Sequence, residues 1–481
     1  MKTPIPWTIG EILEATGGAL LSASGPDSFP GVGIDSRKIQ PGEVFVAIKG
    51  DRFDGHDFID AAVEKKAGCL LIRRDTASRF ENRNLEEKGV FVIAVDDTVS
   101  ALGQMASFLR RKAGIPVVAI TGSTGKTTTR EMTAAICRRK FETLSTAGNF
   151  NNEIGLPLTL FRLAPEHQLA VVELGMNHPG EIRRLSAICS PDIGVITNIG
   201  PAHLEGLGDI QSVAMAKGEL LENIRLGGVA VLNADDEYSR KVKETAKSRV
   251  ILFGTRGEAG IRAEDIRIKN ETVSFTLVMP EARMDINLNA YGAFMVSNAL
   301  AAASVARLLE IGMEEIKAGL ESFRAVEGRM RIYKTPDGVY VIDDTYNANP
   351  MSMEAAIRAL TGSTGEKRGI LVAGDMLELG DSAKHYHEQI GTIAGSTGVA
   401  RLYLAGSYAA QVAKGAKAAG MAGSNIFVGT KTDIIADLSE YLREGDWVLV
   451  KGSRSTGMED VVNRLTHDAS LCRPASQNAE G

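Results

Sequence analysis

A short segment at 121–129, Thr-Gly-Ser-Thr-Gly-Lys-Thr-Thr-Thr, carries the residue types that bind nucleotide phosphates. Gly122 and Gly125 permit a tight turn whose N–H groups face an anion, and the N-terminus of the predicted helix that follows adds the positive end of its dipole. Lys126 supplies a positive charge, and the Thr127 hydroxyl suits Mg²⁺. We therefore predict a site for a nucleoside triphosphate, formed by Gly122, Ser123, Thr124, Gly125, Lys126, Thr127 and Thr128.

The segment differs from the general phosphate loop, because only two residues separate Gly122 from Gly125 where the usual pattern has four. A glycine turn before a helix is often only a turn. Here a buried strand at 117–120, a loop, a lysine, a threonine and a helix follow in order, which favours phosphate binding. What is done with the phosphate must come from other residues.

Three residues downstream could complete the site. Glu173 ends the apolar run 169–174 and His203 follows the run 194–198, so both lie beyond the carboxyl ends of predicted strands. Each is either a metal ligand or a structural residue. Lys217 lies in a helical stretch, where a lysine is ordinarily solvated or salt-bridged.

Side-chain amides gather ahead of another predicted helix, in Asn149-Phe150-Asn151-Asn152. They suit hydrogen bonds to polar ligand groups, and they equally suit a capping turn. Asn149, Asn151 and Asn152 are therefore candidates for substrate binding, with the capping alternative open.

The 481 residues exceed what one hydrophobic core supports, so several domains must position these side chains. We predict an α/β protein with a small N-terminal α/β domain at 1–98 and a central, P-loop-like domain at 99–326. The central sheet is expected to be mostly parallel with a small antiparallel excursion at 261–288. A doubly wound, Rossmann-like domain should occupy 327–468, and 469–481 should form a flexible tail.

The apolar patterns predict the individual elements. The predicted strands are 44–48, 69–72, 117–120, 170–174, 193–198, 228–233, 339–343, 369–373, 402–405 and 447–451. The predicted helices include 99–112, 213–223, 296–309 and 313–323.

Composition excludes several classes of protein. A net charge of −6 provides no basic field that would recruit nucleic acid. Glu11 and Glu14 interrupt the first apolar stretch, and no run reaches the length of a membrane span, so we expect a cytoplasmic protein, and a monomer. The cysteines lack metal-ligand spacing and fit a reducing compartment: Cys69, Cys137, Cys189 and Cys472.

The shortened loop at 121–127 resembles that of the Mur ligases of peptidoglycan synthesis, and the resemblance extends over nearly the whole chain. Asp35-Ser36-Arg37, the segment 41–47 and Gly55-His56-Asp57 resemble the N-terminal domain that holds the UDP-sugar end of the substrate. The resemblance implies substrate binding by Asp35, Ser36, Arg37, Gly55 and His56.

The resemblance also implies roles at the centre of the chain. Thr127, Glu173 and His203 match ligands of Mg²⁺, of which we expect two ions, and Lys126 matches the catalytic phosphate-binding lysine. Lys217 matches a lysine that the family carbamylates with CO₂, which gives an anionic group that helps to hold the metal; unmodified, its positive charge would repel Mg²⁺.

Motifs on both sides of the predicted second domain boundary resemble the nucleotide contacts of the family. In the segment 292–300, Asn298 matches an adenine contact, whereas Phe294 and Met295 replace the usual His and Asn, so no role is carried over to them. Arg329 matches a residue that reaches the phosphates, and Asp344 matches one that meets the ribose.

Three segments resemble the members that join D-alanyl-D-alanine to UDP-N-acetylmuramoyl-tripeptide through an acyl phosphate: 346–350, 373–380 and 451–454. The Asp-Asn-Pro-Arg signature of the member that adds the third residue is absent from the sequence. Neither diaminopimelate nor lysine is favoured as the third residue of the peptide. Substrate contacts are expected from Tyr346, Asn347, Asn349, Ser453 and Arg454.

Three alternatives compete with this interpretation. Thr430-Lys431-Thr432-Asp433 imitates a guanine-reading motif of a P-loop switch, but it lies at a predicted helix start in another domain. A ligase with a different acceptor, such as a folylpolyglutamate synthetase, is disfavoured by the region 35–56. A non-catalytic homologue would have no need of Lys126, Glu173, His203 and Lys217 together.

Overall fold

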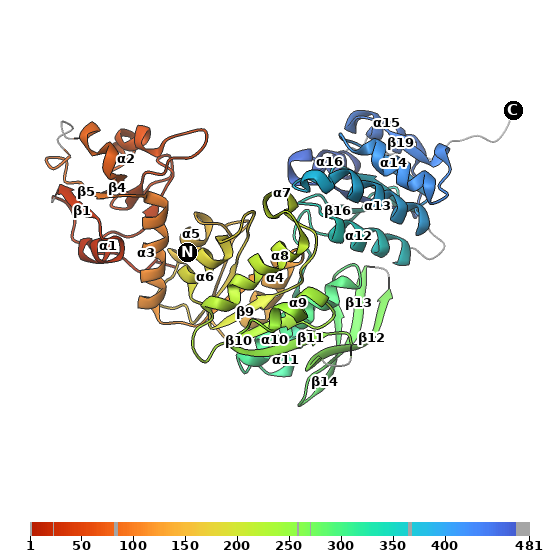
Figure 1. Cartoon of the computed structure of the whole chain (residues 1–481), viewed down its shortest axis with the longest axis horizontal. Helices are drawn as coiled ribbons and strands as arrows, with labels where there is room; N and C mark the ends of the chain where they lie inside the picture. The colour runs from red at the N-terminus through yellow and green to blue at the C-terminus, as the bar shows by residue number, and fades with distance from the viewer. Residues whose placement is uncertain are drawn as a thin grey trace.

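The computed structural model describes residues 2–22, 24–80, 85–256, 259–269, 271–363 and 368–467. Within these residues the strands form three mixed or mostly parallel sheets, one after another along the chain. Figure 1 shows the three units as an open V, with the N-terminal unit in red and orange, the central unit in yellow and green at the base, and the C-terminal unit in blue. The predicted α/β class is confirmed; the tail at 469–481 lies outside the described residues.

The N-terminal sheet has the strand order β1-β5-β4-β3-β2, and only the β1–β5 pair is antiparallel. Its central strands are continuously apolar because both faces are buried: Cys69 and Leu71 pack on one side, Leu70 and Ile72 on the other. The elements are α1 (Ile9–Thr16), β1 (Ala19–Ser22), β2 (Val32–Gly33), β3 (Val44–Val46), η1 (Gly55–Phe58), α2 (Ile59–Glu64), β4 (Cys69–Arg73), η2 (Arg74–Arg79) and β5 (Phe91–Val95). The helix α3 (Thr98–Ala113) follows β5 and leads into the central unit.

The central sheet has the order β14-β13-β12-β11-β10-β9-β6-β8-β7. It is parallel from β7 to β12, and the predicted antiparallel excursion, β12 to β14, extends the same sheet. The strands are β6 (Val117–Thr121), β7 (Thr143–Ser145), β8 (Leu169–Glu173), β9 (Ile193–Ile196), β10 (Val229–Asn233), β11 (Arg249–Gly254), β12 (Ile261–Lys269), β13 (Thr272–Val278) and β14 (Arg283–Leu288).

Helices connect and cover the strands of this sheet. The predicted helix at 213–223 is divided, because α8 ends at Gly218 and a 3₁₀ turn, η3, follows it. The helical elements are α4 (Lys126–Cys137), α5 (Gly155–Leu160), α6 (Glu181–Cys189), α7 (Leu204–Leu207), α8 (Ile210–Gly218), η3 (Glu219–Asn223), α9 (Glu237–Lys243), α10 (Phe294–Leu308) and α11 (Met313–Ser322).

The C-terminal sheet has the order β15-β16-β20-β17-β18-β19, in which only β15 is antiparallel to its neighbour. The strands are β15 (Arg331–Lys334), β16 (Tyr340–Asp344), β17 (Gly369–Ala373), β18 (Arg401–Leu404), β19 (Ile426–Val428) and β20 (Trp447–Lys451). The helical elements are α12 (Pro350–Ser363), η4 (Gly380–Ser382), α13 (Ala383–Ser396), α14 (Ala409–Ala418), η5 (Gly423–Asn425), α15 (Lys431–Tyr441), η6 (Arg454–Thr456) and α16 (Glu459–His467).

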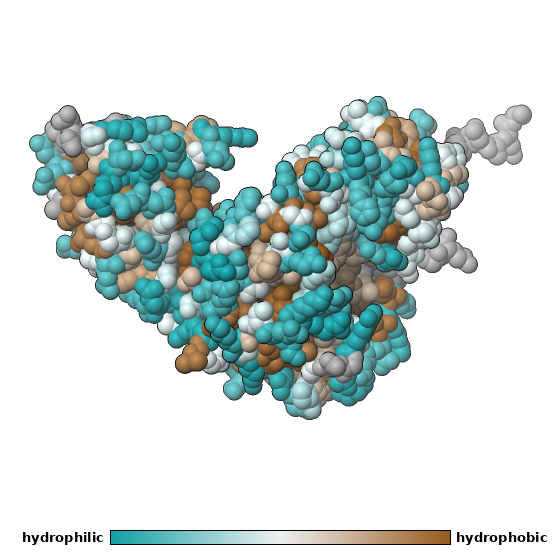
Figure 2. Space-filling view, in the orientation of Figure 1, coloured by the Kyte–Doolittle hydropathy of each residue, from teal (hydrophilic) through white to brown (hydrophobic). Residues whose placement is uncertain are grey.

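The position of β20 determines which loops meet. Because β20 lies between β16 and β17, the carboxyl ends of these three parallel strands are adjacent, and the loops that follow them gather at one edge. Figure 2 shows a surface of mixed polarity and a broad hollow between the N-terminal and C-terminal units, above the central one. Among the described residues, no helix combines the length and the apolar character that crossing a membrane requires.

Candidate active site

The loop between β6 and α4 has the geometry of a phosphate site. Gly122 and Gly125 have φ angles of 150° and 77°. A Cβ atom on Gly122 would overlap the hydroxyl of Thr197, and a Cβ atom on Gly125 would overlap the amide oxygen of Asn298. Asn198 fixes the loop, since its carbonyl accepts from Ser123 N at 3.0 Å and its Oδ1 from Thr124 N at 2.9 Å. These contacts leave the first turn of α4 open at its N-terminus.

The backbone donors of that turn are available to a ligand. Among the described residues no acceptor is bonded to the N–H groups of Gly125, Lys126, Thr127 and Thr128. Lys126 Nζ lies at the same place, 2.7 Å from the carbonyl oxygen of Gly122. Burial lowers the pKa of Lys126 below its ordinary value, Glu173 raises it and Arg329 lowers it. An anion bound here would gain both the free N–H groups and the lysine.

Glu173 lies at the end of β8 with its carboxylate surrounded by donors. The residue is only 2% exposed, and its Oε2 accepts from Thr127 Oγ1 at 2.9 Å, while its Oε1 accepts from Asn151 Nδ2 at 2.9 Å. Arg130, also buried, lies on α4 with Nη1 3.3 Å from Oε2. The carboxylate is therefore ion-paired and also adjacent to the predicted Mg²⁺ ligand Thr127. Nothing in the sequence analysis singled out Arg130, although it follows Lys126 by one helical turn.

His203 occupies the start of α7 with a φ of 55°, a conformation uncommon for a non-glycine residue. Its Nδ1 lies 2.6 Å from Oε2 of Glu378, which belongs to the C-terminal unit. Burial lowers the pKa of His203, Glu378 raises it, and the charges of Lys126 and Lys217 lower it further. The hydrogen bond from His203 holds the pKa of Glu378 below its ordinary value.

Lys217 is a buried lysine on α8. The residue is 1% exposed, and among the described residues its side chain has no hydrogen-bond or ion-pair partner. Burial lowers the pKa of Lys217 far below its ordinary value, and the charge of Lys126 lowers it further. The interpretation as a solvated or salt-bridged lysine is therefore wrong, and the surroundings of the side chain disfavour its charged form.

The amide run 149–152 lies beside the phosphate loop, and one of its side chains makes the capping contact that its sequence suggested. Asn152 Oδ1 accepts from Gly155 N at 2.8 Å and caps the start of α5, as the capping alternative requires. Asn151 instead bonds Glu173. A cavity of about 1050 Å³ is bordered by these side chains, by Asn149, by the phosphate loop and by the residues that follow β9.

One end of this cavity lies against α10. Asn298 accepts from Thr129 Oγ1 at 3.3 Å, and Phe294 borders the cavity. Met295 also contacts the cavity but is almost entirely buried, with its sulfur 3.8 Å from Asn298 Nδ2. Further polar residues border the cavity, although no motif in the sequence pointed to them: Asn233, Asp235, Asp236 and Tyr238.

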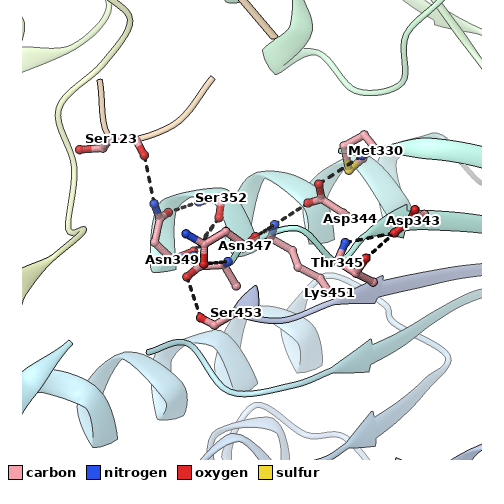
Figure 3. A network of polar contacts seen from close by, with 11 residues as sticks. Ser123, Met330, Asp343, Asp344, Thr345, Asn347, Asn349, Ser352, Lys451 and Ser453 are labelled. Atoms are coloured by element: carbon pink, nitrogen blue, oxygen red, sulfur yellow. Dashed lines mark hydrogen bonds and ion pairs between the residues drawn. The ribbon is translucent and has the colours of Figure 1, made fainter. Parts of the chain in front are cut away.

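The C-terminal unit closes the other side of the cavity. Figure 3 shows Asn349 pointing toward the phosphate loop, where its Nδ2 donates to the carbonyl of Ser123 at 3.3 Å. In the same view Lys451, which is 2% exposed, lies between Asp344 and Asn347, paired with the carboxylate of the first and 2.8 Å from the carbonyl of the second. Lys451 was missed because its partners are separated from it by more than 100 residues.

Arginine and tyrosine side chains stack beside this contact. The Arg329 guanidinium lies 4.0 Å from the ring centre of Tyr346 and borders the cavity. The Arg454 guanidinium also lies near this ring, 5.7 Å from its centre, and pairs with Glu459 at 3.4 Å. Arg454 does not border the cavity. Ser453 Oγ accepts from Leu377 N at 2.9 Å and so braces a neighbouring loop.

The predicted UDP-sugar residues lie apart from the cavity, on the N-terminal unit. Arg37 Nε donates to Asp35 Oδ1 at 2.9 Å and lowers the pKa of Asp35 to about 2, and Ser36 between them is buried. His56 is buried with both ring nitrogens engaged, one 2.6 Å from Asp54 and the other accepting from Arg73 N at 3.0 Å. A Cβ atom on Gly55 would overlap the backbone of Ile48.

The loop, the paired acid and the buried lysine define a nucleotide-dependent enzyme whose site is shared by two units. Family models agree: residues 28–110 match the Mur ligase family, catalytic domain, residues 120–306 the Mur ligase middle domain, and residues 328–454 the Mur ligase, glutamate ligase domain. The chain belongs to the Mur ligase family. It is therefore an ATP-dependent ligase that forms amide bonds.

Individual relatives cover almost the whole chain. The UDP-N-acetylmuramoyl-tripeptide--D-alanyl-D-alanine ligase of Escherichia coli is 37% identical over 464 residues, 95% of this chain and 98% of its own length. A crystal structure of MurF from Acinetobacter baumannii matches with a TM-score of 0.88 and 32% identity, over 97% of this chain and all of that one. MurF ligase from Thermotoga maritima in complex with ADP matches with a TM-score of 0.79 and 29% identity, over 90% and 96%.

Proposed function

We propose that this ligase joins D-alanyl-D-alanine to UDP-N-acetylmuramoyl-tripeptide, and that it does so by first phosphorylating the tripeptide carboxylate. The observation that carries the proposal is one cavity bordered by the phosphate loop, Glu173 and His203 from the central unit and by Arg329 and Asp344 from the C-terminal unit. Two relatives named UDP-N-acetylmuramoyl-tripeptide--D-alanyl-D-alanine ligase, each matched over 98% of its own length, support the choice of substrates.

The residues around the loop fit Mg²⁺ as the metal. Among the described residues no cluster of three His, Cys, Asp or Glu side chains could hold a metal, so Glu173 and His203 would need oxygen donors from elsewhere. Thr127 Oγ1 is one such donor, and phosphate oxygens are others. When bound, the metal supplies positive charge that offsets the charge of the phosphates.

A carbamate on Lys217 would add the missing anionic ligand. A neutral amine attacks CO₂: a nitrogen–carbon bond forms, one proton leaves, and the lysine becomes a carboxylate-bearing side chain. Burial and the charge of Lys126 lower the pKa of Lys217 and so favour the reactive neutral form. The same burial would make an unmodified ammonium costly at this position.

Catalysis by this chain is mainly positioning and charge neutralisation. The open N–H groups of α4 and the Lys126 ammonium would hold the terminal phosphates of ATP, while one oxygen of the tripeptide carboxylate attacks the γ-phosphorus and ADP leaves. The dipeptide amine then attacks the acyl carbon, a proton is lost, and phosphate departs. Contact between Asn349 and the phosphate loop would exclude water from the acyl phosphate.

Each unit would then have its own task. The N-terminal unit, 1–98, would hold the UDP-sugar end through Asp35, Arg37 and the segment around His56. The central unit, 99–326, would bind ATP, and the C-terminal unit, 327–468, would close on it. Residues expected to meet the dipeptide or the tripeptide end are Tyr346, Asn347, Asn349, Ser453 and Arg454.

A product assay tests the proposal. Purified protein is incubated with ATP, Mg²⁺, UDP-N-acetylmuramoyl-tripeptide and a panel of amines, and the products are separated by mass. We expect the pentapeptide product with D-alanyl-D-alanine, with diaminopimelate-containing and lysine-containing tripeptides compared in parallel. A P-loop switch would instead hydrolyse ATP slowly without an acceptor; absence of the pentapeptide would refute the proposal.

A further inference from the structure

One loop of the C-terminal unit reaches the central unit through a single residue. The loop 374–379 follows β17, and Figure 1 shows α7, at the top of the central unit, beside the C-terminal unit. Glu378 makes two bonds across this boundary: its Oε2 lies 2.6 Å from Nδ1 of His203, and its carbonyl accepts from Glu205 N at 3.0 Å. Gly380 packs directly on the backbone of Glu205.

The loop that carries Glu378 is held from several sides. Asp375 accepts from the N–H groups of Ser407 and Tyr408, at 2.8 and 3.0 Å. The buried His387 accepts from Met376 N at 2.9 Å, and Ser453 accepts from Leu377 N at the same distance. Every residue from 375 to 377 is thus fixed within its own unit. The loop presents the next residue, Glu378, as part of a rigid platform.

Glu378 itself has a φ of 63°, in the left-handed region that non-glycine residues rarely adopt. Strained conformations of this kind persist where surrounding structure imposes them, and they concentrate at functional positions. Here the conformation lets one residue direct its carbonyl to Glu205 and its carboxylate to His203. No other part of the described C-terminal unit bonds the His203 ring.

The bond to His203 determines which ring nitrogen is free. A carboxylate only accepts hydrogen bonds, so Nδ1 carries the hydrogen, and in the neutral ring Nε2 then keeps its lone pair. Ligating histidines are commonly held in this way by a carboxylate on the ring nitrogen that does not face the metal. In this chain the carboxylate comes from a different unit from the histidine.

We propose that Glu378 is a positioning residue which, when the C-terminal unit meets the central unit, orients His203 for metal binding through Nε2. The inference rests on the proposed function, in which His203 is a metal ligand. It adds that the metal site is complete only when both units are in contact. Assembly of the nucleotide site and assembly of the metal site would thereby both depend on contact between the same two units.

The test measures Mn²⁺ affinity by calorimetry, on the full chain saturated with a non-hydrolysable ATP analogue. We expect Glu378→Ala to weaken Mn²⁺ binding by about 10–100-fold, as loss of a carboxylate behind a ligating histidine does. Glu378→Gln should recover most of the affinity, because the amide oxygen still accepts from Nδ1–H. The matched control is Asp381→Ala, an exposed acid three residues away, which should bind as the unchanged protein does.

A double mutant separates this inference from the proposed function. If Glu378 acts through His203, adding Glu378→Ala to His203→Ala should cause no further loss of Mn²⁺ affinity. Undiminished affinity in Glu378→Ala, with weakened affinity in His203→Ala, would overturn the inference and leave the metal role of His203 intact. Undiminished affinity in His203→Ala would overturn both, and the product assay would then decide the ligase function independently.

Discussion

Lys217 has the surroundings of a reactive amine and not of a surface lysine. The Lys217 side chain is buried and, among the described residues, unpaired. We expect Lys217→Ala to lower ligase activity by at least about 100-fold, because removing one group that stabilises charge in a transition state typically lowers the rate by about that factor. Formate or acetate should partly restore activity by placing a carboxylate in the vacated space. The measurement is phosphate release with both substrates present.

The control for this prediction is Lys243→Ala, an exposed lysine on α9, which should retain full activity and gain nothing from added carboxylate. Full activity of Lys217→Ala without any addition would refute the carbamate.

Arg130 compensates the buried charge of Glu173. Replacing it by Met leaves that carboxylate without its cation, and breaking a buried pair from one side typically costs about 3–5 kcal/mol. Urea unfolding at pH 7 should show a loss of that size for Arg130→Met. The control is Arg138→Met, because Arg138 is an exposed arginine at the end of the same helix. This variant should change the free energy of unfolding by less than about 1 kcal/mol. Equal losses in the two variants would contradict the account.

At the residue scale, sequence could predict the side chains whose local setting is distinctive. Lys126 and Thr127 follow a strand and a glycine turn, and Glu173 and His203 follow strand ends. Arg130, Glu378 and Lys451 could not be found in this way, because tertiary contacts alone bring them to their partners. The ligand roles of all site residues stay predictions.

At the scale of the element, we expect nucleotide binding to depend on the glycine turn between β6 and α4. Gly125→Ala should abolish measurable ATP binding by calorimetry, because the new Cβ would overlap the Asn298 amide at a φ of 77°. Gly114→Ala is a matched control: this glycine also has a positive φ, 65°, but an added Cβ meets open space. It should cost about 1 kcal/mol of stability and leave ATP affinity unchanged. Normal ATP binding by Gly125→Ala would show that the turn does not bind phosphate.

The loop after β17 depends on a neutral histidine. His387 Nε2 accepts from Met376 N, and burial lowers the pKa of His387 below its ordinary value of 6.5. Above pH 6.5 the His387 ring is mostly neutral in both the folded and the unfolded chain. Just below pH 6.5 the ring is protonated in the unfolded chain but stays neutral in the folded chain, whose pKa is lower. Stability should therefore fall as the pH drops below 6.5, by up to about 1.4 kcal/mol per pH unit from this group.

Thermal unfolding between pH 7.5 and 5.5 checks this prediction. His387→Gln should be less stable than the unchanged protein at pH 7.5, yet lose less stability on acidification. Parallel pH dependence of the two proteins would exclude His387 as the titrating group.

Element types and strand order were only partly accessible from sequence. Apolar runs predicted β6, β8 and β20 to within a residue or two, because buried parallel strands are continuously apolar. The apparent guanine motif at 430–433 is a capping box at the start of α15, with Thr430 and Asp433 bonding each other's backbone. The insertion of β20 between β16 and β17 has no local signal, and it is this insertion that brings Lys451 to Asp344.

At the scale of the whole molecule, the central and C-terminal units share a packed boundary. Tyr291 stacks on Trp447 with ring centres 5.2 Å apart, and its hydroxyl donates to the carbonyl of Ala359 at 3.0 Å. Across the same boundary, Asn349 meets the phosphate loop and Glu378 meets His203. The cavity is bordered by residues of both units, so neither unit alone would complete it.

The central claim is that ATP activates a carboxylate, and oxygen labelling tests it most directly. The terminal carboxylate of the tripeptide is labelled with ¹⁸O, the complete reaction is run in unlabelled water, and the released phosphate is analysed by mass spectrometry. An acyl phosphate requires one carboxylate oxygen to leave with phosphorus, so each phosphate should carry one ¹⁸O atom. Unlabelled phosphate accompanying pentapeptide formation would contradict the account.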